Sequence, residues 1–401
     1  MKKVLFISYF FPPIYSVEST MALNTIKYLT QYGWEPLTVA SNHSREFGID
    51  SSTIVAVSAG LNITRADSTE NFISRFLNWL GIVPDAMFGW RTGATAVARE
   101  LLAQHKIEAI ISRANPITSH LIALTIKRIH PELPWVVLFG DPWTQNPYVK
   151  YRWPWIKPYR EKIERQILNT ADTVIVTTEL TKQLIISKYG LAHKIHVLPN
   201  TYDPSEFVHL KTRSGTSSPV VLTYAGNFYG LRSPEPLLKA LKILREQDVN
   251  IIEHLKIQFV GSLAKFINLI DQHQVGDLVK IIGQLPRART LEVLAQSDGF
   301  ISIDAGWPVP SIFLPAKLMD YLALNKPILA ITPDGEVDQL IRATRTGLVA
   351  SPDDPVAIAN ALRRIYQHQV IVNPDMLAIE RYSAVSYARN LAKLLEALTI
   401  K

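Results

Sequence analysis

The 401-residue sequence contains no cysteine, which excludes disulfides, thiolate metal sites and a cysteine nucleophile, and is compatible with a reducing cytoplasm. Long uninterrupted apolar runs are also missing, because charged residues or prolines break each one, so we expect no membrane-spanning helix. No D-x-D or H-E-x-x-H motif occurs, and no short repeat or low-complexity segment is present. These absences favour a soluble globular protein, and its length favours two domains of about 200 residues each.

The chain carries more basic than acidic residues, with a formal net charge of +7, which indicates an anionic partner such as a nucleotide, a nucleic acid or a membrane surface. The segment Lys150–Lys162 interleaves basic and aromatic residues, a pattern typical of an anionic membrane interface and of stacking on single-stranded nucleic acid. The alternative is a surface loop whose tryptophans pack on the domain. Since no nucleic-acid-binding motif accompanies it, we expect no nucleic-acid partner and keep a peripheral membrane contact beside the packing alternative.

Short apolar or β-branched runs alternate with longer amphipathic segments in both halves, which predicts an α/β fold of parallel sheets covered by helices. The longer segments, for example Ser19–Tyr32, are expected to be helices. The expected strands are Val4–Ser8, Pro36–Ala40, Ala109–Ser112, Trp135–Phe139, Thr173–Thr177 and Lys194–Leu198, then Val220–Ala225, Lys256–Val260, Val279–Ile282, Gly299–Ile303 and Ile328–Ile331.

Between the halves, Pro199–Pro219 is rich in turn formers and is expected to be an interdomain linker. We place an N-terminal Rossmann-like domain at residues 1–205 and a C-terminal Rossmann-like domain at residues 206–379. Two such doubly wound parallel-sheet domains are expected to face a central cleft at the carboxyl ends of their strands, where these folds bind ligands.

Lys317 and Asp320 lie three residues apart on a helix expected at Pro315–Leu324, with Pro315 at its first position and an apolar face directed elsewhere. A lysine at a helix N-terminus opposes the macrodipole, so its presence makes sense if an anion is bound in front of it. Asp320 would then accept hydrogen bonds from hydroxyls beside that anion. The alternative is a solvated i, i+3 ion pair worth about 0.3 kcal/mol.

A second candidate site follows the strand that ends at Ala225. Gly226 permits close backbone approach, Asn227 follows it, and Ser233 is a plausible N-cap for the next helix. Such a loop can offer N–H groups to a phosphate, with Arg232 adding a forked cation; an ordinary strand-to-helix turn is the alternative. Two such sites in one domain favour an arrangement in which Arg232 and Lys317 hold one diphosphate from both sides.

Five motifs follow one another along the chain: Tyr9–Pro13, Phe139–Trp143, Leu198–Phe207, Tyr224–Phe228 and Pro315–Pro327. Their order and spacing together resemble the retaining glycosyltransferases of the GT-B fold, in particular the family called GT4. The resemblance implies a donor nucleotide in the C-terminal domain and an acceptor on the N-terminal domain. It implies no metal requirement and no cofactor besides the nucleoside-diphosphate sugar, which is the donor substrate. It also implies that the helix near residues 380–401 packs back on the N-terminal domain.

By this resemblance, Asp320 occupies the second glutamate position of the family's E-x7-E motif, which binds the nucleotide ribose. The first glutamate position falls on Ile312, so the usual contact to the donor sugar is missing or comes from elsewhere. The loop Asp304–Ser311 is the natural substitute, through its backbone N–H groups or through Asp304. For Asp304, a turn residue at the end of a strand is the alternative.

The acceptor side also departs from the family pattern, because many relatives have glycines after the paired prolines that end at Pro13. This chain has Ser16 and Glu18 there, and Glu18 is expected to face the acceptor or to cap the following helix. Asp141 is placed to orient an acceptor hydroxyl, with an Asp-Pro turn as the alternative. Asn115 resembles a position near the cleft in relatives.

The sequence therefore predicts a cytoplasmic glycosyltransferase, with contact to the inner face of the membrane left open, that moves a hexose-type unit with retention to a glycan or lipid-linked acceptor. Cell-surface polysaccharide or glycoconjugate biosynthesis is the expected context, and Asp141, Arg232 and Lys317 are the expected catalytic residues. One alternative is a non-catalytic partner of another transferase, suggested by Ile312 and the missing glycines. The other is a sugar-nucleotide 2-epimerase. Donor base, sugar, acceptor, linkage and oligomeric state stay open.

Overall fold

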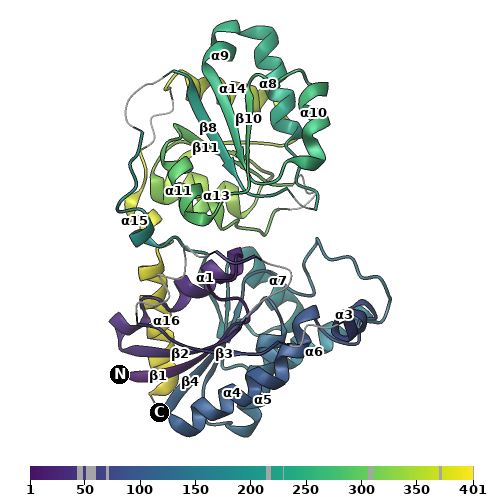
Figure 1. Cartoon of the computed structure of the whole chain (residues 1–401), viewed down its shortest axis with the longest axis vertical. Coiled ribbons are helices and arrows are strands. Elements are labelled where there is room, and N and C mark those ends of the chain that lie inside the picture. The colour runs from purple at the N-terminus through teal and green to yellow at the C-terminus, as the bar shows by residue number, and fades with distance from the viewer. Residues whose placement is uncertain are drawn as a thin grey trace. The chain divides into compact units, whose positions relative to one another are not determined.

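The computed structural model describes residues 1–42, 48–50, 60–68, 72–213, 218–228, 230–305, 310–369 and 373–400. They form two compact units, one of Met1–Thr201 with Ala384–Lys401 and the other of Tyr202–Ser383 (Figure 1). The predicted limits at 205 and 380 each differ by four residues from these limits at 201 and 384. The last helix of the chain thus belongs to the first unit.

The first unit contains a parallel sheet of seven strands among the described residues, in the order β3-β2-β1-β4-β5-β6-β7. Its strands are β1 (Lys2–Ile7), β2 (Trp34–Ser41), β3 (Asn62–Ala66), β4 (Ile107–Arg113), β5 (Trp135–Phe139), β6 (Thr173–Val176) and β7 (Ile195–Val197). Its helices are α1 (Val17–Ile26), α3 (Phe72–Trp79), α4 (Arg91–Gln104), α5 (Thr118–Ile129), α6 (Ile156–Thr170), α7 (Glu179–Tyr189) and α16 (Ala384–Thr399).

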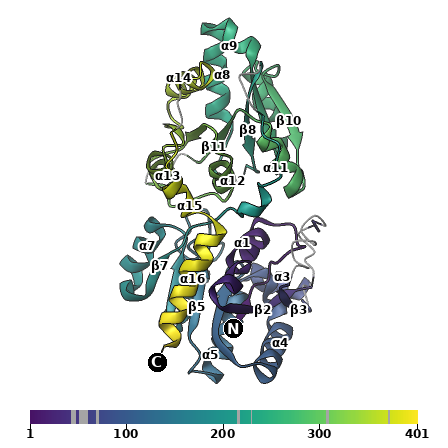
Figure 2. The same cartoon turned by 90° about the vertical axis from the view of Figure 1, so that its left-hand side faces the viewer.

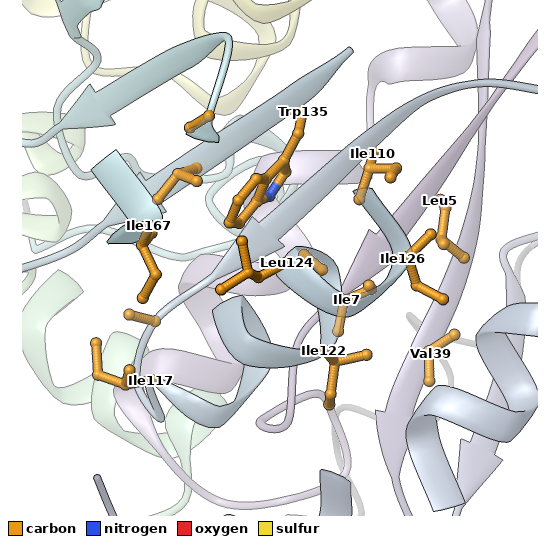
Figure 3. Close-up of a cluster of buried hydrophobic side chains, with 14 of the residues drawn as sticks. Leu5, Ile7, Val39, Ile110, Ile117, Ile122, Leu124, Ile126, Trp135 and Ile167 are labelled. Carbon is orange, nitrogen blue, oxygen red and sulfur yellow. The ribbon is translucent and has the colours of Figure 1, made fainter. Parts of the chain in front are cut away.

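Alternation along β1 divides the core of this unit into two layers. Leu5 and Ile7 face α4, α5 and α6, where Figure 3 shows them with side chains of α5 such as Leu124 and Ile126. Val4 and Phe6 face the opposite side, which α1 and α16 cover (Figure 2). Because both faces are buried, the inner strands β5 and β6 are apolar almost throughout, as expected for a parallel sheet.

The second unit contains a six-stranded parallel sheet among its described residues, in the order β10-β9-β8-β11-β12-β13. Its strands are β8 (Val220–Ala225), β9 (Leu255–Val260), β10 (Val279–Gly283), β11 (Gly299–Ile303), β12 (Ile328–Ile331) and β13 (Gly347–Ala350). Its helices are α8 (Glu235–Gln247), α9 (Val249–His254), α10 (Ile267–Gln272), α11 (Arg287–Ala295), α12 (Lys317–Leu324), α13 (Glu336–Thr344), α14 (Pro355–Tyr366) and α15 (Met376–Glu380).

Both sheets reverse direction of winding at one point, between β1 and β4 in the first unit and between β8 and β11 in the second. Loops leave adjacent strands in opposite directions at such a switch point, and this opens a crevice at the carboxyl ends where ligands bind. The predicted fold class, two doubly wound Rossmann-like parallel-sheet domains, is confirmed. The topology therefore predicts ligand binding at the loops after β1 and β4 in the first unit and after β8 and β11 in the second.

The predicted limits of two helices need correction. The helix expected at Ser19–Tyr32 ends at Ile26 and is followed by a 3₁₀ turn that closes at Gly33, whose φ is +85°. The helix expected from Pro315 begins at Lys317, because the Pro315 carbonyl accepts from the Leu318 N–H in a tight turn that precedes it. Lys317 therefore occupies the first helical position.

The segment expected to be a linker is for the most part packed. Tyr202 is buried in the second unit, and the Asp203 side chain caps a 3₁₀ turn at Pro204–Glu206. Phe207 and Leu210 pack against the apolar cluster of the second unit that contains Tyr202. Residues 214–217 of the predicted linker lie outside the described residues. The change of unit thus occurs abruptly after Thr201.

Candidate functional site

The β8 and β11 loops bring four of the predicted residues together in the second unit. Gly226 follows β8, Arg232 lies in the same loop, and Asp304 follows β11. Lys317 starts α12, and a Cβ placed on Gly226 would lie 3.6 Å from Lys317 Cδ and 3.8 Å from Lys317 Nζ. All of them therefore lie at the switch point of this sheet.

Arg232 and Asp304 form an almost fully buried ion pair. Arg232 Nε donates to Asp304 Oδ1 at 3.1 Å, and the two side chains are only 5% and 1% exposed. Asp304 also accepts from the Ala305 N–H at 2.8 Å and from the Ser311 hydroxyl. Asp304 thus holds Arg232 and the start of the loop in place. Its predicted contact to the donor sugar stays a prediction. The adjoining residues 306–309 lie outside the described residues.

Lys317 is in a different electrostatic situation from Arg232. Within the described part of the chain its ammonium makes no hydrogen bond and no ion pair, and it lies 3.4 Å from the centroid of the Tyr224 ring. Burial, followed by the neighbouring Arg232 cation, holds the pKa of Lys317 well below its usual range, while Asp304 acts in the opposite direction. Two adjacent cations share one carboxylate here, so a bound anion would relieve both repulsion and desolvation.

The Gly226 loop is supported by a glycine that sequence reasoning missed. Gly261, after β9, has a φ of +128°, and a Cβ there would lie 2.3 Å from the Gly226 carbonyl oxygen. Asn227 Oδ1 accepts from the Ser262 N–H at 2.8 Å, which ties the two loops together. Asn227 therefore acts on the loop's shape through its side-chain oxygen. Only glycine permits both this close approach and the positive φ.

Asp320 does not pair with Lys317, so the solvated i, i+3 pair considered above is absent from the structure. Arg287 of α11 holds the carboxylate with two hydrogen bonds of 3.0 and 3.3 Å and binds Glu206 with two of 2.7 and 2.6 Å. Asp320 is buried. A carboxylate offers about four acceptor positions, so two remain for further hydrogen-bond donors. Arg287 and Glu206 were not predicted, because a single sequence gives no sign of pairings across 33 and 81 positions.

The equivalent site of the first unit contains charges of both signs. Arg113 ends β4, and its Nη2 lies 3.4 Å from Glu18 Oε2 in the first turn of α1. Burial is the largest cause that raises the pKa of Glu18; the Asp141 carboxylate adds to it and Arg113 opposes it. Asp141 follows β5 and is exposed. The charges of the predicted residues Glu18 and Asp141 are thus close enough to interact, and Arg113, which sequence reasoning overlooked, pairs with Glu18.

The remaining acceptor-side predictions have separate local roles. Ser16 is the N-cap of α1, and its hydroxyl accepts from the Ser19 N–H at 3.0 Å, so the cap is Ser16 and not Glu18. The Pro13 carbonyl accepts from the Asp50 N–H at 2.8 Å. Asn115 is exposed between β4 and α5, and no hydrogen bond or ion pair among the described residues joins it to the charged groups.

Arg113 also has unused hydrogen-bonding capacity. Its side chain is buried, and its Nε has no hydrogen-bond partner among the described residues. Together with Thr25, Asn200 and Tyr387 it lines a small pocket within the first unit. A buried donor without a partner is costly, so this pocket is suited to a water molecule or to an acceptor oxygen.

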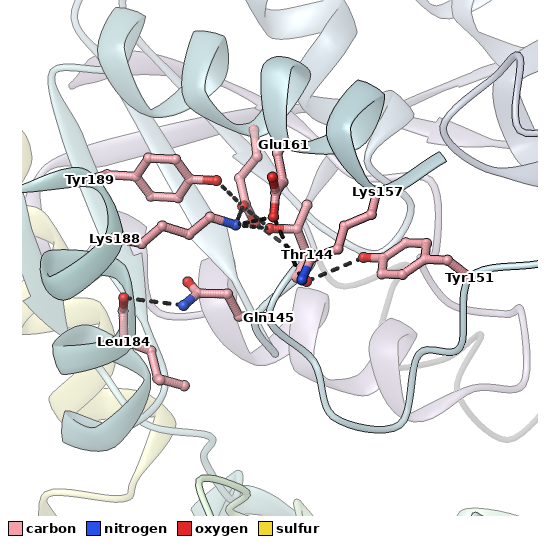
Figure 4. A network of polar contacts seen from close by, with 9 residues as sticks. Thr144, Gln145, Tyr151, Lys157, Glu161, Leu184, Lys188 and Tyr189 are labelled. Carbon is pink, nitrogen blue, oxygen red and sulfur yellow. Dashed lines mark hydrogen bonds and ion pairs between the residues drawn. The ribbon is translucent and has the colours of Figure 1, made fainter. Parts of the chain in front are cut away.

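The loop that carries Asp141 is anchored at Thr144 by a network of polar contacts with Lys188 and its neighbours (Figure 4). Glu164 of α6 accepts from the Thr144 N–H at 3.2 Å, from the Thr144 hydroxyl, and from the Tyr189 hydroxyl at 2.6 Å. Lys188 of α7 bridges Thr144 at 3.0 Å and Glu161 at 2.7 Å. These contacts fix the loop between β5 and α6 on two helices.

In the parts of the chain that the structure describes, no group of three or more histidine or acidic side chains is arranged to hold a metal ion. The helices in those parts also fail to combine the length and apolarity needed to cross a bilayer.

Comparison with known families covers nearly the whole chain. Residues 19–206 match the family described as Glycosyltransferase Family 4, and residues 206–390 match the family described as Glycosyl transferases group 1. Among curated proteins, the amylovoran biosynthesis glycosyltransferase AmsK of Erwinia amylovora is 24% identical over 241 residues, which is 57% of this chain and 56% of that protein. The chain spans about half the length of the curated relatives it matches.

Solved structures share the fold at low sequence identity. Anabaena HepE in complex with UDP and glucose superposes with a TM-score of 0.70 at 14% identity over 99% of this chain and 100% of that chain. A UDP-N-acetylglucosamine 2-epimerase gives a TM-score of 0.59 at 14% identity over 100% of this chain and 97% of that chain. The fold alone therefore does not distinguish transfer from epimerisation, whereas the two adjoining family matches do name a family. This chain belongs to the GT4-like family of glycosyltransferases with the GT-B fold.

Proposed function

We propose that this chain transfers a hexose-type sugar from a nucleoside-diphosphate sugar to an acceptor hydroxyl, with retention of configuration and without a metal ion. The observation that carries the proposal is the partly buried Lys317 ammonium, which lies near the Arg232 cation and makes no hydrogen bond among the described residues. It faces the Gly226 loop at the switch point of the second sheet. A diphosphate supplies the missing negative charge.

The donor is held by groups with different tasks. Lys317 and Arg232 bind the diphosphate, with Arg232 oriented by its bond to Asp304. The loop at Gly226 and Asn227 faces the phosphates, and Asp320 accepts hydrogen bonds from the ribose hydroxyls. During transfer, negative charge grows on the leaving diphosphate, and cations already fixed in a water-poor site stabilise that charge without reorganising.

The acceptor binds the first unit in this proposal. Asp141 orients the acceptor hydroxyl, and the charged pair of Glu18 and Arg113 binds neighbouring polar groups of the acceptor. The departing phosphate helps to remove the acceptor proton, so no strong protein base is required. Pro13, Ser16 and Asn115 shape the surrounding loops at the ends of β1 and β4.

We further propose a glycan or a lipid-linked acceptor, a cytoplasmic location and a role in polysaccharide or glycoconjugate biosynthesis. AmsK, whose name assigns it to amylovoran biosynthesis, supports this context. A contact of Lys150–Lys162 with the inner face of the membrane is part of the same proposal. The alternatives predict different products: an epimerase would convert a sugar nucleotide without an acceptor, and a non-catalytic partner would convert nothing.

The test is a panel of nucleoside diphosphates and their sugar conjugates, with the thermal stability of the full chain as the readout. A ligand present at about 100 times its dissociation constant stabilises by about 2.7 kcal/mol, which gives a selective rise in the unfolding temperature. The same sugar nucleotide is then incubated with candidate glycan and lipid acceptors. Sugar transfer supports the proposal, an epimerised sugar nucleotide supports the epimerase, and no stabilisation by any nucleotide contradicts the donor site.

A further inference from the structure

A cluster of exposed aromatic side chains lies on the first unit. It combines α3 with the segment that leads into α6 (Figure 1). Phe72 is 82% exposed, Phe76 46%, Trp79 45% and Trp155 54%. We call the exposed side chains of residues 72–82 and 148–160 the aromatic–basic surface. Soluble domains seldom leave so many large apolar groups together in water.

The rings are ordered in a continuous stack, although they are exposed. Phe72 stacks on Phe76 with centroids 6.2 Å apart, and Phe76 on Trp79 at 5.9 Å. Trp79 contacts Trp153 edge-on at 6.1 Å, and Trp153 stacks on Trp155 at 5.2 Å. The alternative in which the tryptophans of 150–162 simply pack into the domain is thus only partly realised, because Trp155 keeps more than half of its surface exposed.

Two hydrogen bonds join α3 to the segment that leads into α6. Trp155 Nε1 donates to the Leu80 carbonyl at 3.2 Å, and the Tyr159 hydroxyl donates to the Ile82 carbonyl at 3.0 Å. Both contacts satisfy backbone groups just beyond the end of α3. Helix α3 is therefore held in place by Trp155 and Tyr159, while its own aromatic side chains stay exposed.

Gly81 makes this joint possible. Its φ is +74°, and a Cβ at this position would lie 2.3 Å from Ile156 Cγ1. Ile156 is buried, so it has little freedom to move away. Any larger residue at position 81 would separate α3 from the start of α6.

The charge of the surface is predominantly positive, with one acidic residue at its border: Glu161 lies 4.0 Å from Lys157 and pairs with Lys188 at 2.7 Å. Residues 72–82 and 148–160 contain five cations, and no aspartate or glutamate. The cations are Arg75, Lys150, Arg152, Lys157 and Arg160. Arg152 lies over the Trp79 ring, 5.1 Å from its centroid. Cations next to tryptophan and tyrosine are typical of segments that lie at the headgroup level of an anionic membrane.

We infer that the aromatic–basic surface docks the protein on a bilayer that contains anionic phospholipids. The phenylalanines of α3 enter the acyl boundary, the tryptophans lie among the headgroups, and the exposed cations Arg75, Lys150, Arg152 and Lys157 contact lipid phosphates. The eight-residue α3 is too short to cross a membrane, so it lies along the surface. A second copy of the chain is a poor occupant, because it would oppose like charges.

This inference extends the acceptor part of the proposed function, since a docked enzyme meets lipid-linked acceptors at the bilayer. The experiment keeps the two claims separate by measuring vesicle binding and nucleotide binding on the same samples. The full chain is mixed with vesicles of phosphatidylcholine alone or of phosphatidylcholine with phosphatidylglycerol, and bound protein is measured by flotation. We expect binding to the anionic vesicles that weakens as salt is raised, because exposed charges are screened.

Two double variants separate the apolar from the charged contribution. Phe72→Ser with Phe76→Ser removes the inserted rings, and we expect its vesicle affinity to fall about tenfold or more. Arg152→Gln with Lys157→Gln weakens binding and flattens the salt dependence. The control, Leu377→Ser, removes an 84% exposed apolar side chain of α15 in the other unit and leaves vesicle binding unchanged. All variants retain the unfolding temperature and nucleotide affinity of the wild type.

Three results would overturn the inference. One is a wild type that does not float with anionic vesicles at low salt. Another is equal vesicle binding by the double serine variant and the wild type. The third is a surface that binds single-stranded oligonucleotides, or associates with itself, more tightly than it binds vesicles, with the same variants abolishing that binding. Each leaves nucleotide binding intact, so failure here is distinct from failure of the donor site.

Discussion

The two switch points of this molecule have the same topology and opposite chemistry. In the second unit, the loops after β8 and β11 bring together two cations and one buried carboxylate. In the first unit, the loops after β1, β4 and β5 bring together one buried cation and two carboxylates. Strand order thus determines where a ligand can bind, and the side chains at the strand ends determine the charge that the ligand meets there.

The largest expected effect comes from breaking the buried pair of the second unit. Asp304→Asn leaves Arg232 charged and almost fully buried without its carboxylate, so we expect a loss of about 3–5 kcal/mol in the free energy of unfolding. Urea unfolding measures it, with the exposed Asp353→Asn as the matched control. A loss no larger than that of the control would mean that the pair does not hold the loop.

A smaller effect follows from filling the space that Gly261 leaves open. Gly261→Ala adds a Cβ 2.3 Å from the Gly226 carbonyl and strains a φ of +128°, so we expect a loss of about 1–3 kcal/mol in stability and weaker nucleotide binding. Gly190→Ala is the control, because its φ is +84° but nothing lies within 4 Å of the added Cβ. Equal nucleotide affinity in both variants would contradict the role given to the Gly226 loop.

The pH dependence of nucleotide binding sharpens the comparison. The pKa of Lys317 is lowered in the free protein, and a bound diphosphate raises it, so binding takes up a proton. Affinity is therefore full below the lowered pKa and falls as pH rises through it. The measurement is made at pH values well above the phosphate pKa of about 6. Lys317→Arg keeps its charge and should bind with an affinity that does not change over this range. Parallel pH profiles would exclude Lys317 as the titrating group.

The smallest effect is expected in the first unit. Burial raises the pKa of Glu18, so the folded protein binds this proton more tightly than the unfolded chain does. The protonated carboxyl stabilises the folded protein, and this contribution to the free energy of unfolding is lost as pH rises through the raised pKa. Glutamine stays neutral at every pH, so the Glu18→Gln variant does not lose it. We expect a gain below about 1 kcal/mol at neutral pH that disappears in acid, because the side chain is 30% exposed. Nucleotide affinity should be unchanged; a large loss would place Glu18 at the donor.

The sequence was most informative where strands are buried on both faces. The limits of β5, β8, β11 and β12 agree with the prediction residue for residue, because apolar runs bounded by turns leave little ambiguity. The edge strand β3 was missed since its residues alternate between exposed and partly buried. Helix α14 was also missed, although Asp354 before Pro355 is a clear start signal.

The site was predictable only as far as local patterns reach. Glycine, arginine and lysine at strand ends and helix starts indicate an anion site from their neighbours in sequence. The pairing of Arg287 with Asp320, and of Arg113 with Glu18, joins residues 33 and 95 positions apart. Exposure was equally hidden: α3 has the composition of a buried helix, yet most of its aromatic surface is outward.

The central claim is that Lys317 holds the donor diphosphate, and calorimetric titration of a nucleoside diphosphate into the wild type and Lys317→Ala tests it most directly. Removing one charged partner of a phosphate costs about 2–3 kcal/mol, so we predict a loss of roughly 30- to 150-fold in affinity with an unchanged unfolding temperature. Lys239→Ala, an exposed lysine of α8, should bind like the wild type. Equal affinity in Lys317→Ala and the wild type would contradict the account.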